Sequence, residues 1–221
     1  MKTFFSKTLK ILAGVALLGA INLNAAQEGV DYVKLDKPLN VSGKTLVKVF
    51  SYACPFCYKY DKTVTPKVVD KLKAAGVTFE PYHLKTKGEY GEAASKIFAV
   101  LAIKDQAAGV GFFDENSLFK KAKMAYYKAY HDKKERWGNG KDEAAFLKTG
   151  LEASGLSQAD FEAGLQDPKV QELLSKWDAS YDVAKVQGVP AFVVNGKYLL
   201  MTSKITSIEG MAKLVEELSA K

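Results

Sequence analysis

Two cysteines three positions apart, Cys54 and Cys57, are the residues of this chain whose spacing is best suited to chemistry. They are the only cysteines among 221 residues, so they cannot build a disulfide scaffold or, by themselves, a four-ligand zinc site. They can, however, form one redox couple. The preceding segment, 46–52, has the β-branched and aromatic composition of a strand, and the residues after Cys54 have a helical pattern. The sequence therefore predicts that the pair opens a helix directly after a strand.

The start of a helix favours a thiolate on Cys54. Unpaired backbone N–H groups and the positive end of the helix dipole both stabilise a negatively charged sulfur. Pro55 suits this position because the N–H that it lacks belongs to the first turn. Cys57 comes one turn later and is expected to be the more buried. We therefore predict that Cys54 is the attacking sulfur in thiol–disulfide exchange and Cys57 the resolving one.

A structural disulfide and a zinc site are the alternatives to a redox role. A bridge that closes only four residues removes little conformational entropy from the unfolded chain, so it would stabilise the fold weakly. A zinc site would need His83 and His131, which lie far apart in the sequence. It would also lack the second cysteine pair that gives such a motif its specificity. The spacing favours redox chemistry over both.

The elements that must position the cysteines are strands at the two ends of the chain. Four segments have the composition and length of strands: 46–52, 77–84, 191–194 and 198–201. Pro81 places the second of them at a sheet edge or a bulge. Asn195-Gly196 between the last two is a strong hairpin signal. A helix from Cys54 to Ala75 should be kinked at Pro66.

Helical spacing dominates the middle of the chain. Strand signals vanish between 89 and 167, where four helical segments are predicted, one of them capped by Asn116 or Ser117. Asp167-Pro168 then opens a long helix that ends at Gly188, with an apolar stripe that includes Trp177 and Tyr181. A last helix is expected from 207 to 218.

These elements predict the α/β class, with one mixed sheet flanked by helices and interrupted by an all-helical insertion. The hydrophobic content of 48% is sufficient for a full core. Four parts are expected: a signal peptide (1–25), a first part of the sheet domain (26–87), the helical insertion (88–167) and a second part of the sheet domain (168–221).

Two segments resemble the DsbA family of thioredoxin-fold thiol oxidases. The stretch from Phe50 to Tyr58 is similar to the active-site segment of that family, and the stretch from Gly188 to Tyr198 is similar to its cis-proline loop and the hairpin that follows. The helical block lies where this family inserts its helical domain. The resemblance implies a thioredoxin fold with an inserted all-helical domain. It also implies thiol:disulfide oxidoreductase activity carried by the redox-active disulfide Cys54–Cys57, with no bound cofactor and no metal.

The same resemblance implies that a cis peptide bond precedes Pro190 and places the backbone of Val189 beside the cysteines. An extended client peptide could then pair with the backbone groups of Val189 while it lies across Cys54. Without the resemblance, Val189-Pro190 would predict no more than a turn before a strand, because most X-Pro bonds are trans.

The dipeptide between the cysteines, Pro55-Phe56, differs from that of the better-known family members, which have a histidine in place of Phe56. A Pro-Phe pair resembles the DsbL-type members, whose partners are the membrane protein DsbI and a periplasmic arylsulfate sulfotransferase. Phe56 supplies no charge. Stabilisation of the thiolate is therefore expected from the helix start, the Val189 region and nearby lysines such as Lys59 and Lys62.

Asp61 stands seven residues after Cys54, where the family has a buried acid near the resolving cysteine. A buried carboxylate with a raised pKa could relay a proton to or from Cys57. The alternative is a solvated acid flanked by Lys59 and Lys62. The family's partner lysine on the following strand is not evident, because Pro81 stands in that stretch.

The formal net charge of +7 is partly explained by the N-terminus. Lys2, Lys7 and Lys10 precede an apolar run of about 13 residues (11–23), which is typical of a cleavable signal peptide and shorter than the roughly 20 residues of a spanning helix. Cleavage would leave 29 basic and 25 acidic residues, or about +4, which gives nucleic-acid binding little support. We expect a soluble protein exported to the periplasm, with a retained membrane anchor as the alternative.

The expected function is that of an exported thiol:disulfide oxidase. It would donate its disulfide to reduced client proteins, among them an arylsulfate sulfotransferase. It would be re-oxidised by a quinone-coupled membrane partner of the DsbB or DsbI type, and it would act as a monomer. A disulfide isomerase, a thiol reductase, a general DsbA and a non-catalytic folding module remain the alternatives.

Overall fold

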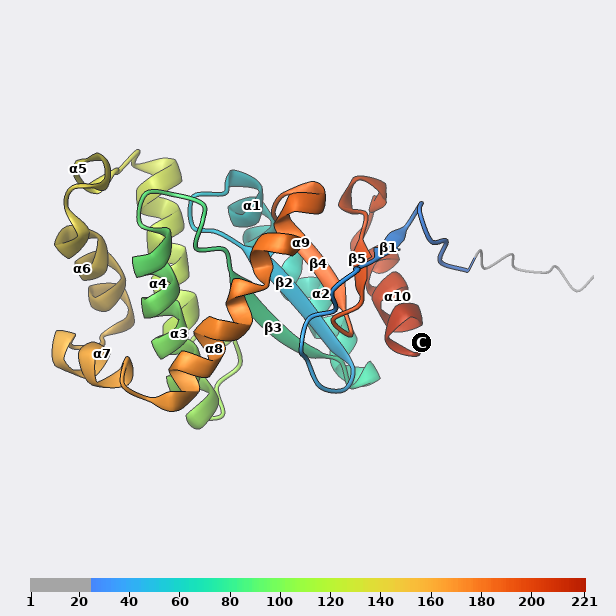
Figure 1. Ribbon diagram of the computed structural model, residues 1–221, viewed down its shortest axis with the longest axis horizontal. Coiled ribbons are helices and arrows are strands. Elements are labelled where there is room, and N and C mark those ends of the chain that lie inside the picture. The colour runs from blue at the N-terminus through green and yellow to red at the C-terminus, as the bar shows by residue number, and fades with distance from the viewer. Residues whose placement is uncertain (1–24) are drawn as a thin grey trace, which may run out of the picture.

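The computed structural model describes residues 25–221 (Figure 1). The expected signal peptide, 1–25, lies outside the described residues except for Ala25. Among residues 25–221, no helix combines the length and the apolar composition needed to cross a membrane.

Five strands form one mixed sheet in the order β1-β5-β4-β2-β3. They are β1 (Tyr32–Lys34), β2 (Thr45–Phe50), β3 (Thr78–His83), β4 (Ala191–Val194) and β5 (Tyr198–Leu200). β2 and β3 are parallel, and the other pairs are antiparallel. The two ends of the chain therefore build one sheet, as predicted. Pro81 lies in the edge strand β3, which agrees with the expectation for a residue that cannot donate a ladder hydrogen bond.

Helices cover both faces of the sheet. One face packs against α2 (Thr65–Leu72) and α10 (Ile208–Ser219), and the other packs against α9 (Ser180–Gln187). α1 (Pro55–Thr63) follows β2 directly, and the chain breaks at Val64 before Pro66, close to the expected kink. A short 3₁₀ turn, Lys73–Ala75, then ends at Gly76. A second such turn, Thr202–Lys204, precedes α10.

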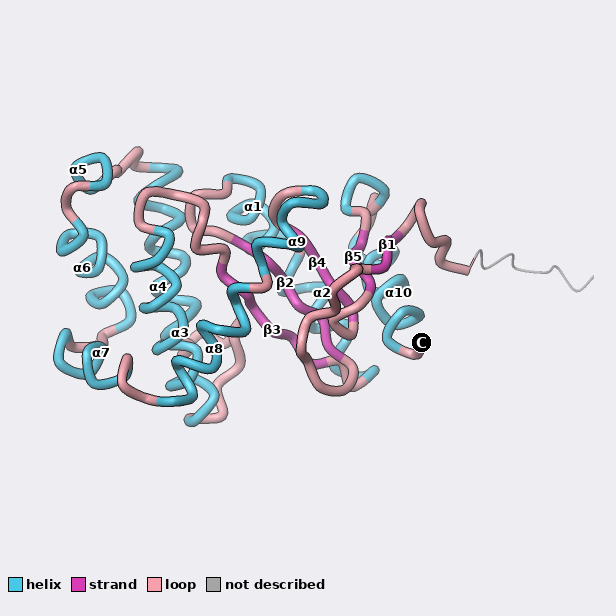
Figure 2. The backbone as a smooth tube through the Cα atoms, viewed as in Figure 1, coloured by secondary structure: helices cyan, strands magenta, loops and turns pink. Residues whose placement is uncertain are grey.

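The helical insertion lies beside the sheet and has no strand among its described residues (Figure 2). Its helices are α3 (Gly91–Ala107), α4 (Leu118–Tyr127), α5 (Trp137–Gly140), α6 (Glu143–Ser154) and α7 (Gln158–Gly164). A wider π-type turn, Lys128–Asp132, extends α4. Ser117 caps α4 by accepting a hydrogen bond from the N–H of Lys120, so one of the two predicted caps is confirmed. The expected boundaries at 88 and 167 fall in connecting segments.

The predicted long helix from Pro168 to Gly188 is two helices, α8 (Pro168–Asp178) and α9, which meet at Ala179. α8 packs against α3 of the insertion, whereas α9 crosses the sheet, so one straight helix could not serve both surfaces (Figure 1). The prediction of a continuous apolar stripe is therefore wrong at Tyr181. Trp177 is buried, but Tyr181 is 49% exposed.

The sheet and the insertion share a hydrophobic core. Val49 of β2, Tyr52 after it, and Phe98 and Phe119 of the insertion belong to one continuous buried cluster. Because protein cores are close-packed, this shared cluster fixes the insertion relative to the end of β2, where the cysteines lie.

Candidate active site

Cys54 is the N-cap of α1, as the sequence predicted. Its backbone is extended (φ −99°, ψ 112°), and its sulfur accepts a hydrogen bond from the N–H of Cys57 at 3.1 Å. Pro55 occupies the first turn, where no N–H is needed. Both cysteines are free and buried, whereas Phe56 between them is 63% exposed. The helix start therefore directs an N–H group at Cys54, and the exposed Phe56 adds neither charge nor a conventional hydrogen bond.

The loop before β4 meets Cys54 from the other side. The peptide bond between Val189 and Pro190 is cis, as the family resemblance implied. The thiol of Cys54 donates a hydrogen bond to the carbonyl oxygen of Val189 at 3.2 Å. The structure thus brings Val189 and Pro190 to the cysteines from a segment more than 130 positions away in the sequence.

The surroundings divide the two cysteines into different roles. The hydrogen bond between the two sulfurs lowers the pKa of Cys54; burial opposes this, and the N–H of Cys57 and the charges of Lys87 and Lys48 lower it further. Burial raises the pKa of Cys57 well above its ordinary value, and the neighbouring Cys54 raises it more. At neutral pH, Cys54 is therefore the better thiolate, and Cys57 holds its proton.

The lysines that favour the thiolate are not the ones expected from the sequence. Lys59 and Lys62 were expected, but Lys87 and Lys48 are the cations that lower the pKa of Cys54. Lys62 instead lies over the ring of Tyr58, 4.2 Å from its centroid. Because Lys59 and Lys62 are exposed on α1, solvent screens their charges.

A close loop contact brings Lys87 to the site. The hydroxyl of Ser51 donates to the carbonyl oxygen of Lys87 at 2.9 Å and accepts from the N–H of Ala53 at 3.1 Å. Gly88 follows with φ +94°, and a Cβ atom on it would lie 2.6 Å from the hydroxyl oxygen of Tyr52. A glycine at this position is therefore what allows the loop to pack against the residues just before Cys54.

Asp61 is buried beneath Cys57, one helical turn further along α1. Its carboxylate accepts from the ammonium group of Lys48 at 2.5 Å and from the hydroxyl of Tyr127 at 3.1 Å. Lys123 lies 3.3 Å from the second carboxylate oxygen. The alternative of a solvated acid between Lys59 and Lys62 is therefore wrong.

The direction of the Asp61 pKa also differs from the expectation. Burial alone would raise the pKa of Asp61, but the charges of Lys123 and Lys48 outweigh burial and hold it below its ordinary value. The expected raised pKa is thus wrong, and Asp61 stays ionised at neutral pH. The role of Asp61 as a proton relay stays a prediction, and it no longer has a raised pKa to support it.

Comparison with known proteins agrees with this geometry. A family model described as a DSBA-like thioredoxin domain matches residues 45–216. The thiol:disulfide interchange protein DsbL of Escherichia coli O6:H1 is 64% identical over 211 residues, which cover 96% of this chain and 95% of that protein. The chain belongs to the DsbA family. As a member of that family, it is a thiol:disulfide oxidoreductase.

Within the DsbA family, the similarity to DsbL proteins is much higher than that to DsbA proteins. DsbL of Lelliottia amnigena is 62% identical, over 97% of this chain and 96% of that protein. The crystal structure of DsbL from Salmonella enterica serovar Typhimurium superposes with a TM-score of 0.87 at 66% identity, covering 89% of this chain and 98% of that one. DsbA of Yersinia pestis, by contrast, is 28% identical over 86% of this chain. The Pro55-Phe56 resemblance to the DsbL type is confirmed.

Two residues of this DsbA-family site, Lys48 and Lys123, were not predicted from the sequence. Lys48 stands in the buried strand β2, and a charged residue in an otherwise apolar strand was the available signal. Lys48 pairs across the sheet with Pro81 of β3. The buried lysine therefore lies on the strand next to the one on which the family resemblance had placed it. Lys123 comes from α4 of the insertion, and nothing in its neighbourhood in the sequence marks it.

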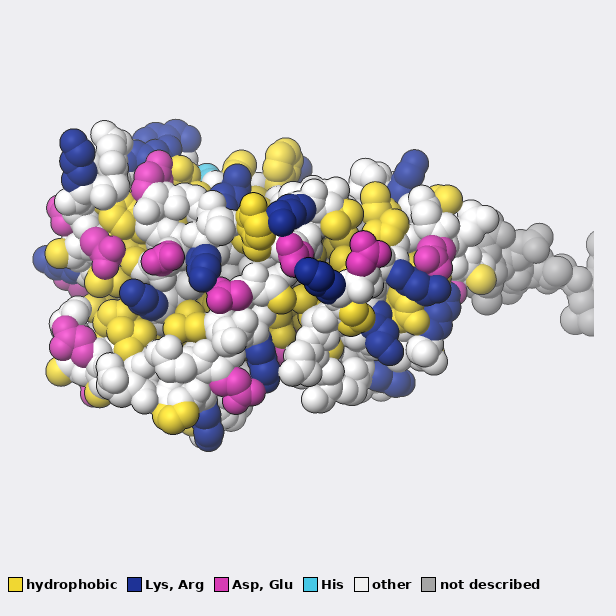
Figure 3. Space-filling model, viewed as in Figure 1, with side chains coloured by type: hydrophobic (Ala, Val, Ile, Leu, Met, Phe, Trp, Pro, Cys, Tyr) yellow, Lys and Arg dark blue, Asp and Glu magenta, His cyan; other side chains and the backbone are white. Residues whose placement is uncertain are grey.

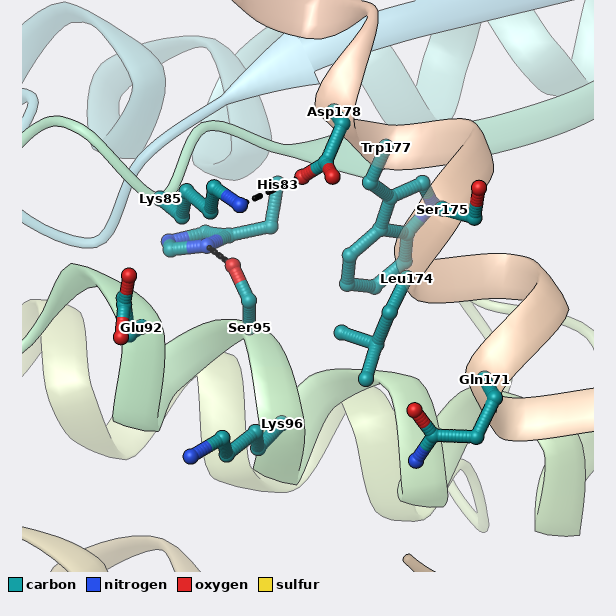
Figure 4. A pocket seen from close by; sticks show the side chains of 10 residues that line it. All are labelled: His83, Lys85, Glu92, Ser95, Lys96, Gln171, Leu174, Ser175, Trp177 and Asp178. Atoms are coloured by element: carbon teal, nitrogen blue, oxygen red, sulfur yellow. Dashed lines mark hydrogen bonds and ion pairs between the residues drawn. The ribbon is translucent and has the colours of Figure 1, made fainter.

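The two histidines take structural positions. Burial lowers the pKa of His83 to about 3, so its ring is neutral, and its Nδ1 lies 2.7 Å from the hydroxyl of Ser95. It borders a cavity of about 320 Å³ between α3 and α8, lined also by Lys85 and Trp177 and not by either cysteine (Figure 4). Nε2 of His131 lies 2.9 Å from the carbonyl oxygen of Tyr52. Among residues 25–221, no three His, Cys, Asp or Glu side chains come together as a metal site would require.

Proposed function

We propose that this chain is an exported oxidase that donates the Cys54–Cys57 disulfide to reduced client proteins in the periplasm. The observation that carries the proposal is the difference between the two sulfurs: Cys54 has a lowered pKa at a helix start, and Cys57 is a buried thiol with a raised pKa. A couple whose reduced form is stabilised in this way is oxidising.

The reaction follows from that difference. A client thiolate attacks the sulfur of Cys54 in the oxidised pair, the bond to Cys57 breaks, and Cys57 takes up a proton. A second client thiolate then attacks the client sulfur of the mixed disulfide. Cys54 leaves as the stabilised thiolate, and the client keeps a new disulfide. Two electrons have moved from the client to the cysteine pair, so the reaction itself needs no bound cofactor.

The carbonyl oxygen of Val189 supports a docking position for the client. It lies within hydrogen-bond distance of Cys54 and comes from a loop whose backbone can pair with an extended peptide. Exposed Phe56 offers an apolar contact at the same place.

The proposed partners follow from the similarity to DsbL proteins. We infer an arylsulfate sulfotransferase as one client, and a quinone-coupled membrane protein of the DsbB or DsbI type as the re-oxidising partner. Lysines and acids are interspersed over the face shown in Figure 3, where no basic patch of the kind that binds nucleic acid gathers. The monomer is proposed with no such support.

Trapping mixed disulfides tests the client range. In Cys57→Ala, the Cys54 thiolate attacks a client disulfide and displaces one client sulfur, and the mixed disulfide persists because Cys57 is not there to attack it; the attached proteins can be identified after export. Recovery of chiefly one sulfotransferase supports a dedicated oxidase. A broad spread of exported proteins supports the general DsbA alternative.

The direction of electron flow needs its own measurement. Equilibration with glutathione should leave the cysteine pair reduced at ratios where a structural disulfide would stay oxidised. A pair that stays oxidised under these conditions would favour a reductase. A dimer that repairs a scrambled client would favour an isomerase. If Cys54→Ser still oxidises clients, the catalytic proposal is wrong.

A further inference from the structure

The buried ionic cluster beneath the cysteines, formed by Lys48, Asp61 and Lys123, has more positive than negative groups. Lys48, Asp61 and Lys123 have side chains that are 1%, 1% and 3% exposed. Two lysines thus face one carboxylate in the interior, and the remaining partners of the cluster are hydroxyl groups: that of Thr65, 3.2 Å from Lys48, and that of Tyr127. With both lysines protonated, the cluster has a net charge of +1. A buried charge without a counter-charge is costly, so this excess lowers the pKa of Lys123 unless a compensating anion is present.

Neighbouring groups do not supply that anion. The hydroxyl of Tyr127 stays protonated, because burial and Asp61 raise its pKa well above the usual value. Lys123 also faces the rings of Phe50, Phe113 and Phe119, with centroids 5.2 to 5.5 Å from its nitrogen. Cation–π contacts of this kind stabilise an ammonium group but do not cancel its charge.

The cysteines can supply the compensating negative charge. Cys57 and Asp61 are four residues apart on α1, and both are buried, so the cluster lies one turn beneath the sulfurs. When the pair is reduced, Cys54 can ionise, and Lys48 of the cluster lowers its pKa; when the pair is oxidised, neither sulfur carries a charge. The unbalanced lysine therefore interacts favourably with the reduced form alone.

We propose that Lys123 is a positioning residue for this reaction: its charge, in excess over Asp61, favours the Cys54 thiolate and makes the pair more oxidising. The inference rests on the proposed oxidase function. It gives the helical insertion a part in the chemistry, because Lys48 and Asp61 of the sheet domain would by themselves form a neutral pair. It also identifies a source of positive charge below the site, which matters because the Pro55-Phe56 dipeptide between the cysteines carries no charge.

The charges around Lys123 are consistent with this role. The pKa of Lys123 is lowered overall: burial and the charge of Lys48 outweigh Asp61, and a negative Cys57 sulfur raises it. The groups that face it are thus Asp61 and Cys57 from α1, Lys48 from β2 and Tyr127 from α4 itself. A negative charge on the cysteine pair and protonation of Lys123 therefore favour each other.

The test is Lys123→Met in the full mature chain, which leaves one lysine for one carboxylate. Thiolate absorbance at 240 nm against pH should show the pKa of Cys54 raised by about one unit. The equilibrium constant for reduction by glutathione should fall about tenfold, which is about 30 mV for a two-electron couple. Lys48→Met leaves the other neutral pair and should shift both measurements in the same direction, so the test survives if one variant fails to fold.

Lys121→Met is the matched control. Lys121 lies on the same helix, two residues away, with an exposed side chain, so the variant removes the same formal charge from the surface. It should leave both measurements unchanged. The double variant Lys123→Met with Asp61→Asn restores a net charge of +1 on Lys48 and should return the pKa of Cys54 toward that of the parent protein.

The proposal is overturned if folded Lys123→Met has the same Cys54 pKa and glutathione equilibrium as Lys121→Met. It is also overturned if the double variant shifts further from the parent instead of returning toward it, since this is what a purely structural role would give. Client oxidation separates this failure from a failure of the proposed function. Lys123→Met retains both cysteines and should still oxidise clients at stoichiometric concentrations, whereas Cys54→Ser should not.

Discussion

The thiol of Cys54 donates a hydrogen bond to the carbonyl oxygen of Val189 at 3.2 Å, across 135 positions of sequence. This contact holds the protonated sulfur against the loop that precedes β4. Ionisation removes the proton and leaves the sulfur facing the carbonyl oxygen, while the N–H of Cys57 still donates to it. Ionisation of Cys54 therefore removes its hydrogen bond to Val189 and keeps the one from Cys57.

The lowered pKa of Cys54 predicts a redox-dependent stability profile. A group whose pKa is depressed in the folded state stabilises that state above its unfolded pKa and loses this contribution as the pH falls through its folded pKa. The reduced protein should thus lose stability, relative to the oxidised protein, as the pH falls from about 8 through the folded pKa of Cys54. Urea unfolding of both forms across this range measures the difference.

The comparison with the oxidised form isolates the cysteines. Asp61 also has a lowered pKa and loses its contribution on acidification, but it does so in both redox forms. The raised pKa of Cys57 destabilises the reduced protein only above the ordinary thiol value, where the unfolded chain would ionise. A stability difference that does not vary with pH below 8 would show that Cys54 has no depressed pKa.

Asp61→Asn should be among the more destabilising single substitutions of this chain. It leaves two buried lysines without a carboxylate, and breaking a buried ion pair from one side costs about 3–5 kcal/mol of unfolding free energy. Urea unfolding of the oxidised protein gives the cost without interference from the thiols. Asp70→Asn is the control, because its pair with Lys73 is 73% exposed on both sides, where solvent screening leaves it little effect on stability. Equal costs for the two variants would contradict a buried ionised cluster.

The cysteine pair and the fold could be predicted from the sequence because their signals are local. A strand followed by two cysteines and Pro55 specifies a helix start from neighbouring residues alone, and Asn195-Gly196 specifies a hairpin in the same way. The cis bond before Pro190 has no local signal, and it was expected only through the family resemblance.

The charged cluster could not be predicted because it is assembled from three distant segments. Asp61 was found through the family resemblance at its position after Cys54, but its partners come from β2 and from α4 of the insertion. The direction of its pKa depends on the balance between burial and two cations, which no pattern in one segment reports. The break between α8 and α9 was not predicted for a related reason. α8 packs against the insertion and α9 packs against the sheet, and one straight helix could not contact both surfaces.

Phe56→His should lower the pKa of Cys54 further. Phe56 is 63% exposed, so the substitution should change the unfolding free energy by no more than about 0.5 kcal/mol. An imidazolium group next to Cys54 would add a cation that the wild-type dipeptide lacks. Thiolate absorbance against pH measures the shift, and Phe56→Leu controls for the loss of the ring. If the histidine and leucine variants titrate alike, charge at this position does not influence Cys54.

Gly88→Ala should disturb the active site from outside the cysteine motif. Gly88 has φ +94°, and a Cβ atom there would lie 2.6 Å from the Tyr52 hydroxyl oxygen and 2.9 Å from Cβ of Ala53. Since Lys87 lowers the pKa of Cys54 and is held by Ser51, displacing this loop should raise that pKa. We expect a destabilisation of about 1–3 kcal/mol, measured by urea unfolding, together with slower alkylation of Cys54 at neutral pH.

Gly43→Ala separates the effect of backbone strain from the effect of the close contact between Gly88 and Tyr52. Gly43 has a similarly positive φ of +63°, but a Cβ atom there would meet nothing within 4 Å, so the variant tests backbone strain alone. It should cost about 1 kcal/mol and leave the alkylation rate of Cys54 unchanged. Equal alkylation rates in Gly88→Ala and Gly43→Ala would mean that the approach of the Lys87 loop has no part in activating Cys54. A slower rate in Gly88→Ala alone would assign that part to the contact between Gly88 and Tyr52.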